Sequence, residues 1–214
     1  MGESFAIRDC ALIAIATGQS AHTLIELRDR LEIVPESSIY YHFWGGLLRP
    51  RFDDPEYQND FAVWVRHNIH DKTLAERMAL VNPTDFSDME MLRRELVDMI
   101  EERMDESDSL PWIKALNTFY FVRSQIVIFD TKKTLNLPEE LGAHLPHMSL
   151  GSIFYHFIDS RRRTPLGSDD FTHWLSSFGN EYIVLIEQLS SIDPYFINLI
   201  ELRDELAKMF KRNA

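Results

Sequence analysis

The sequence Ser38-Ile39-Tyr40-Tyr41-His42-Phe43 recurs 114 residues further along the chain as Ser152-Ile153-Phe154-Tyr155-His156-Phe157. A second pair, Asp60-Phe61-Ala62-Val63-Trp64-Val65 and Asp170-Phe171-Thr172-His173-Trp174-Leu175, matches at an offset of 110. Ordered matches at two consistent offsets predict an internal duplication. We expect residues 1–108 to form copy one and residues 109–214 to form copy two, related by a pseudo-twofold axis.

Helical patterns fill most of each predicted copy. Thr23 and Glu26 have the spacing of a capping box, and leucines at helical spacing follow them. Ser37 or Ser38 is expected to start the next helix, and Asn59 or Asp60 a third. A second capping-box match at Ser87 opens a long acidic helix within residues 85–108, and a last helix is expected over residues 196–211.

One apolar run near the start of each copy is a candidate strand. In copy two the run covers residues 119–129 and is rich in aromatic and β-branched side chains, which favours a strand. The matching run in copy one, residues 10–16, contains more alanine and is ambiguous. The sequence therefore predicts a mainly α-helical fold, with α+β as the alternative. Each helical unit opens with at most one short strand, and the two strands could pair into a small sheet.

Charge and cysteine content narrow the class of protein. The formal net charge is −12 and the sequence pI is about 5.1, so the surface repels phosphate backbones and anionic membranes. We therefore expect neither a nucleic acid nor a membrane as partner. Residues 1–108 carry 22 acidic and 11 basic side chains, so the negative charge lies mostly in copy one. A lone Cys10 and no evident secretion signal predict a cytoplasmic protein.

Several motifs resemble an uncharacterised prokaryotic family of duplicated helical domains. The resemblance rests on four stretches of copy one, with weaker versions in copy two: Thr17-Gly18-x-x-Ala21-x-x-Leu24-x-Glu26-Leu27, Ser38 to Phe43, Asn59-Asp60-Phe61-Ala62-x-Trp64, and Leu74-Ala75-Glu76-Arg77. Copy two departs from the first motif and has Lys132 where copy one has Gly18. The family carries no assigned activity, so the resemblance implies a helical fold and no function.

A histidine and an aspartate recur together in the two copies, as His42 with Asp60 and His156 with Asp170. An imidazole positioned by a carboxylate is a common acid–base arrangement. The same pair also serves as a structural tie, because a buried imidazole needs a hydrogen-bond partner and a helix-starting carboxylate supplies one. The sequence favours the tie, since a packing device must persist in both copies.

Aromatic side chains at matched positions are candidates to line a pocket. They are Tyr40, Tyr41, Trp64, Tyr155 and Trp174. Aromatic residues at helical spacing are more often core residues than ligand contacts. Two His-x-x-His spacings, at His67 and at His144, are weak metal signals, so we expect no metal and no cofactor.

These observations lead to three functional hypotheses. The first is a non-enzymatic helical module that binds a partner protein or a small regulatory ligand, because phosphate-cradling loops and nucleophile elbows are absent from the sequence. Its proposed contact face is the acidic helix that contains Glu95, Asp98 and Glu102. The second is a hydrolase that uses the His–Asp pairs. The third is a small-molecule sensor with a pocket between the two copies.

Overall fold

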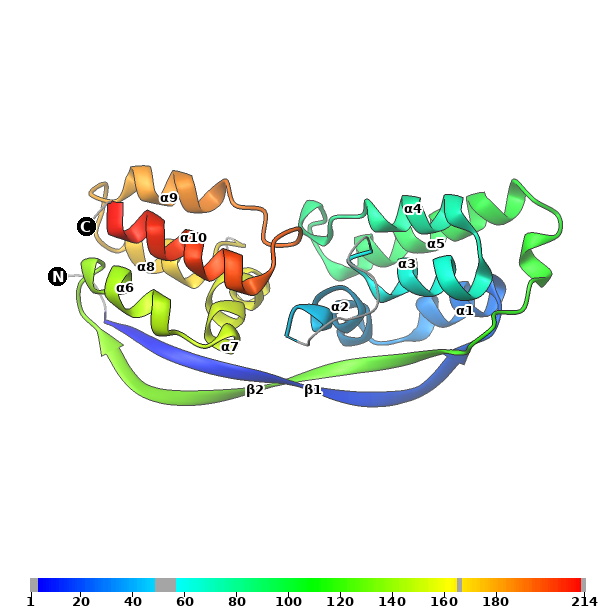
Figure 1. Cartoon of the computed structure of the whole chain (residues 1–214), viewed down its shortest axis with the longest axis horizontal. Coiled ribbons are helices and arrows are strands. Elements are labelled where there is room, and N and C mark those ends of the chain that lie inside the picture. The colour runs from blue at the N-terminus through cyan, green and yellow to red at the C-terminus, as the bar shows by residue number, and fades with distance from the viewer. Residues whose placement is uncertain (1–3, 49–56, 165–166, 213–214) are drawn as a thin grey trace. The chain divides into compact units, whose positions relative to one another are not determined.

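The computed structural model describes residues 4–48, 57–164 and 167–212. Helices and two long strands alternate along the chain (Figure 1). The elements are β1 (Phe5–Ala21), α1 (Leu24–Ile33), α2 (Glu36–Trp44), α3 (Asp60–Trp64), α4 (Lys72–Ala79), α5 (Met89–Asp105), β2 (Phe119–Leu135), α6 (Glu139–His144), α7 (Leu150–Ile153), α8 (Asp170–Ser176), α9 (Ile183–Ser190) and α10 (Leu199–Arg212). Short 3-10 and π-helical turns connect several of them.

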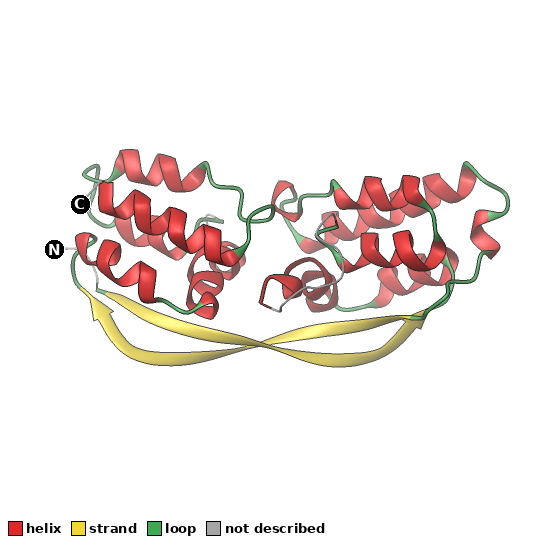
Figure 2. Cartoon of the chain, in the orientation of Figure 1, coloured by secondary structure: helices red, strands yellow, loops and turns green. Residues whose placement is uncertain are grey.

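The two strands form one two-stranded sheet (Figure 2). The Thr17 hydroxyl donates to the carbonyl of Phe121 at 2.7 Å, whereas the Thr131 hydroxyl donates to the carbonyl of Ile7 at 2.5 Å. Residue numbers therefore increase along β1 in the direction in which they decrease along β2, and the sheet is antiparallel.

The prediction of a mainly α-helical fold made of duplicated helical units is wrong. The chain is 58% helical and its two strands are 17 residues long, so the fold is mixed α+β. The expected pairing of the two runs is observed, but each strand extends well beyond the apolar run that announced it. The extensions after each run, 17–20 and 130–134, are mostly polar, and they are extended because their backbone groups pair with the other strand rather than because of their composition.

The chain divides into two compact units, and each unit contains part of both strands. Unit 1 comprises Met1–Ala11 and Ile126–Ala214, and unit 2 comprises Leu12–Gln125. The expected division at residue 108 assigned each strand to the helices that follow it. The first part of β1 belongs to unit 1, whose helices begin at α6. The first part of β2 belongs to unit 2, whose helices precede it in the sequence.

Unit 2 is built from the first five helices. The helix α1 packs against α5, α3 packs against α4, and both α2 and α4 contact α5. The Thr23 hydroxyl accepts the amide of Glu26 at the start of α1, and the Asn59 side chain accepts the amide of Ala62 at the start of α3, as their sequences predict. The helix α2 begins at Glu36, ahead of the expected serines, because it follows Pro35.

Unit 1 is built from the last five helices. The helix α10 packs against α6, α7 and α9, and α8 packs against α9. The helix α10 begins at Leu199, three residues later than predicted, and its buried face consists of Leu199, Leu202, Leu206, Ala207 and Phe210. Within the described residues, no helix combines the length and the apolar character that a membrane crossing requires.

Candidate functional site

His42 and Asp60 meet in unit 2. His42 lies in α2 and Asp60 is the first residue of α3, and the His42 Nδ1 is 2.9 Å from the Asp60 Oδ2. The other ring nitrogen, Nε2, accepts the backbone N–H of Val122 in β2 at 3.1 Å. One turn earlier in α2, the hydroxyl of Ser38 donates to the carbonyl of the same Val122 at 2.9 Å. One helix therefore holds both backbone polar groups of one strand residue.

The same set of contacts occurs in unit 1. His156 lies in the π-helical turn Phe154–Ile158, and its Nδ1 is 2.8 Å from the Oδ2 of Asp170 at the start of α8. Its Nε2 accepts the backbone N–H of Arg8 in β1 at 2.9 Å, and the Ser152 hydroxyl donates to the Arg8 carbonyl at 2.6 Å. We call the serine and histidine that hold one strand residue a strand clamp: Ser38 and His42 hold Val122, and Ser152 and His156 hold Arg8.

These hydrogen bonds define the protonation state of each imidazole. The Nε2 atom accepts an N–H and so carries no proton, and the proton on Nδ1 points at a carboxylate. Both rings are buried, with side chains 4% exposed for His42 and 3% for His156. A general base needs a lone pair within reach of its substrate. Here the strand occupies that lone pair, so the geometry is that of a structural tie.

The clamps also solve a problem that a two-stranded sheet creates. Each strand has a partner on one side only, so alternate residues direct their N–H and C=O groups away from the sheet. Val122 and Arg8 are two such residues, and the clamps satisfy them. An aromatic ring lies beside each histidine, Phe119 at 4.8 Å from His42 and Phe5 at 4.8 Å from His156, between ring centroids.

An arginine lies beside Asp170. The Nη2 of Arg163 is 3.1 Å from the Asp170 Oδ2, and its guanidinium carbon lies 4.0 Å from the ring centroid of Tyr155. Burial opposes the charge of Arg163, but the carboxylates of Asp170 and Asp159 prevail and raise its pKa above the ordinary value. The Asp170 side chain is 19% exposed, so part of this carboxylate remains accessible.

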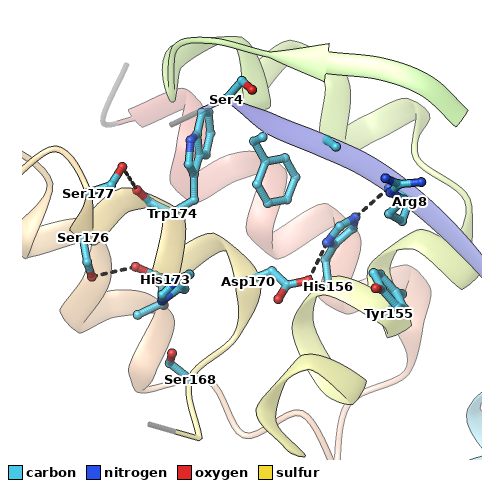
Figure 3. A pocket seen from close by; sticks show the side chains of 13 residues that line it. Ser4, Arg8, Tyr155, His156, Ser168, Asp170, His173, Trp174, Ser176 and Ser177 are labelled. Atoms are coloured by element: carbon cyan, nitrogen blue, oxygen red, sulfur yellow. Dashed lines mark hydrogen bonds and ion pairs between the residues drawn. The ribbon is translucent and has the colours of Figure 1, made fainter. Parts of the chain in front are cut away.

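A pocket of about 690 Å³ opens beside Asp170 (Figure 3). Its walls come from the start of β1, from the turn that carries His156 and from α8. The lining residues are Ser4, Phe5, Ala6, Arg8, Tyr155, His156, Ser168, Asp170, Thr172, His173, Trp174, Ser176 and Ser177. Of the predicted residues, His156, Asp170, Tyr155 and Trp174 therefore lie together in unit 1.

The remaining predicted residues belong to unit 2. Tyr40, Tyr41 and Trp64 are buried there, and the indole N–H of Trp64 donates to the Asn117 carbonyl at 2.8 Å. They belong to a different compact unit from Tyr155, with which Tyr40 and Tyr41 were expected to share a pocket.

The sequence analysis missed Arg8, His173 and the two clamp serines. The serines lie in the repeated hexapeptides themselves, four residues before each histidine, and this spacing places them on the same helical face. Arg8 had no such signal, because only the fold brings β1 to helices near the end of the chain.

The His-x-x-His spacings form no cluster of metal ligands in the described residues, where no group of three or more suitable side chains occurs. His70 has a left-handed backbone (φ 64°), so it does not continue the helical face of His67. His144 and His147 line a smaller pocket of about 200 Å³ together with Asp9.

Comparisons with known proteins give two matches. A family model described as a family of unknown function (DUF5752) matches residues 2–211. The solved structure of OrfY from Thermoproteus tenax is similar, with a TM-score of 0.84 and 25% sequence identity over 99% of this chain and 95% of that chain. No curated protein matches the sequence.

Proposed function

Because the chain belongs to the family of unknown function DUF5752, membership assigns no activity, and we propose from the geometry that it is a non-enzymatic module that binds a small ligand beside Asp170. One observation carries the proposal. The histidines of both His–Asp pairs use their two ring nitrogens within the chain, yet one pair borders a pocket of about 690 Å³. The pocket therefore offers room for a ligand, while the histidine of its His–Asp pair has no free ring nitrogen to act as a base.

The polar groups around the pocket support ligand binding. Asp170 uses its Oδ2 for His156 and Arg163, which leaves its Oδ1 as an acceptor. Among the described residues, the hydroxyl of Tyr155 and the imidazole of His173 have no hydrogen-bond partner. Small-molecule sites combine an aromatic lining with a few polar groups of this kind. A cytoplasmic setting, which the free thiol of Cys10 favours, is part of the proposal.

Native mass spectrometry under gentle desolvation tests this proposal. We expect a fraction of the purified protein to carry the mass of a bound metabolite, or the apo protein to acquire one from a metabolite library. Tyr155→Phe and His173→Ala alter the pocket without touching a clamp and should reduce the bound fraction. The control is His22→Ala, an exposed histidine in unit 2.

The hydrolase alternative gives a different result in the same experiment. A binding module releases the ligand chemically unchanged after long incubation, and the mass of the released molecule shows this directly. Products that form with wild type and fail to form with a folded His156→Asn variant would show that the protein is a hydrolase and not a binding module. An apo mass together with no stabilisation by any ligand class would contradict the proposal.

A protein partner for unit 2 is the second candidate function. The exposed side of α5 carries Asp98 and Glu102, with Glu95 half-buried beside them. Trp112 and Leu116, in the connection after α5, are 77% and 71% exposed. Exposed apolar side chains mark candidate interaction surfaces, and a surface of one charge favours a partner of the opposite charge. Reversing Glu95, Asp98 and Glu102 to lysine should abolish cross-linking to a partner, and retained cross-linking would eliminate this face.

A further inference from the structure

Two networks of charged side chains reach the pocket, each through one residue of its lining, Arg8 and Asp170. Arg8 and Lys132 share one carboxylate, that of Asp130. On the other side, Arg162 and Arg163 share Asp159, and Arg163 also contacts Asp170. The carboxylate of Asp170 is paired with Arg163, which leaves Arg8 as the cation of the lining, although the chain as a whole carries a net charge of −12.

Arg8 is the less tightly bound of the two cations beside Asp130. The Nη1 of Arg8 is 3.6 Å from the Asp130 Oδ2, beyond hydrogen-bond distance, whereas the Lys132 Nζ is 2.9 Å from the same oxygen. The hydrogen bond from Lys132 is also the main reason why the pKa of Asp130 is lowered. The side chain of Arg8 is 41% exposed. Its guanidinium thus keeps donors for a further acceptor.

A second donor lies at the same end of the pocket. Burial raises the pKa of the Tyr155 hydroxyl, and the charges of Arg163 and Arg8 act on it in the opposite direction. Arg8 and Tyr155 both line the pocket, and the raised pKa keeps this hydroxyl protonated at neutral pH. Figure 3 shows Arg8 and Tyr155 on the side of His156 that faces away from Trp174. A guanidinium and a phenol together suit an oxyanion.

The opposite end of the pocket has a different character. The rings of Phe5 and Trp174 lie 5.0 Å apart between centroids, and both line the pocket. An occupant of the whole pocket needs an apolar part in addition to its charged group. We propose that the pocket binds a small organic oxyanion, whose carboxylate or phosphate pairs with Arg8 and Tyr155 and whose apolar part faces Phe5 and Trp174. This inference rests on the proposed function, since it presupposes a ligand in the same pocket.

Matched probes that differ only in charge test the inference. Phenylacetate and phenyl phosphate carry the oxyanion, phenylacetamide is neutral, and phenethylamine is cationic. Binding is measured at constant ionic strength by calorimetry and by the shifts of the Arg8 Nε–H and Trp174 indole N–H resonances. We expect saturable binding of both anions and binding of the amide that is weaker by about tenfold or more, the usual loss for one charge-assisted hydrogen bond.

Variants link the binding to the named side chains. Arg8→Gln should weaken phenylacetate binding by about tenfold, and Tyr155→Phe should weaken it by a smaller factor. Arg8→Lys should restore part of the affinity, because the charge returns without the planar fork. The clamp holds only the backbone of Arg8, so these variants keep it. Arg123→Gln, an exposed arginine of β2 in unit 2, should bind like the wild type.

The outcomes separate this inference from the proposed function. Equal affinity of wild type and Arg8→Gln for phenylacetate would overturn the assignment of the oxyanion to Arg8. Tight binding of the amide or the amine at the Trp174 resonance, without the anions, would overturn the ligand class but keep the pocket as a binding site. If no probe or library compound of any charge shifts these resonances, both the inference and the proposed function fail.

Discussion

At the scale of single residues, the two histidines illustrate how one side chain joins distant parts of the chain. Each imidazole connects a carboxylate on one side to a strand amide on the other. The serine one turn earlier completes the connection by binding the carbonyl of the same strand residue. The hexapeptides are therefore explained by the backbone groups that they bind, with no reference to a reaction.

Removal of a clamp serine should destabilise the protein. Ser38→Ala leaves the carbonyl of Val122 without its hydrogen bond in a partly buried place, and we expect a loss of about 1–3 kcal/mol in the free energy of unfolding. Urea denaturation measures it. Ser37→Ala, the matched change one position earlier in α2, should have little effect. Equal stability of the two variants would contradict the role of the clamp.

The stability of the protein should depend on pH through Asp169, the residue that caps α8. This carboxylate is 2% exposed and accepts the amide and the hydroxyl of Thr172, and burial raises its pKa. The folded state therefore binds its proton more tightly than the unfolded state. The contribution of Asp169 to stability is full below about pH 4, the ordinary range of an aspartate, and is lost as the pH rises through the raised pKa.

Asp169→Asn keeps an amide oxygen for the cap but carries no charge. We expect its free energy of unfolding, relative to wild type, to rise between pH 4 and pH 7, as measured by urea denaturation at a series of pH values. Asp88→Asn is the control with the opposite sign. Asp88 caps α5, and the hydrogen bonds from Met91 and Ser87 lower its pKa. If the free energy of unfolding of Asp169→Asn relative to wild type does not change with pH, burial does not oppose the charge of Asp169.

At the scale of elements, α7 shows how closely a helix approaches β1. A Cβ atom at Gly151 would lie 2.3 Å from the carbonyl oxygen of Cys10 and 2.4 Å from the Asp9 Oδ1. Backbone stands in the way, so relaxation requires the helix and the strand to separate. Only glycine at this position keeps Ser152 and His156 within hydrogen-bonding distance of Arg8.

Gly151→Ala should therefore lower the melting temperature and the free energy of unfolding, by about 1–3 kcal/mol as for other overpacked sites. Gly142→Ala in α6 is the matched control, since its nearest neighbours would be 3.4 Å away and alanine favours helices. If both variants have the same melting temperature, α7 and β1 lie further apart than these distances imply.

The elements also show what a sequence can predict here. Side-chain caps at Thr23 and Asn59 are local, and their helices begin where the sequence places them. The strands were predicted too short, because residues beyond the apolar runs, such as Gly18, Asp130 and Lys133, have little intrinsic preference for extended structure. The partner strand and the clamps impose it, and both come from distant sequence. The His–Asp pairs could be predicted from the repeated motifs. The pocket could not, because its lining includes Arg8, which only the fold brings to this place.

At the scale of the whole molecule, the connectivity of the units makes a further prediction. Unit 1 needs Met1–Ala11 as well as Ile126–Ala214, and unit 2 runs through to Gln125. A chain divided at residue 108 therefore gives two fragments, and each lacks a strand segment that completes its own unit and lies in the other fragment. We expect neither fragment alone to unfold cooperatively, and the two to copurify when they are coexpressed. A fragment that folds alone would contradict this interdependence.

The distance in sequence between β1 and the residues that hold it affects how the protein folds during translation. Arg8 is made 144 residues before Ser152 and 148 residues before His156, the two residues that hold it. The segment around Arg8 has no pairing strand until β2 is made, and no helix covers it until α7 and the turn that carries His156 follow. Translation speed and chaperone occupancy near the amino terminus should therefore govern the yield of this protein more than the stability of its finished fold.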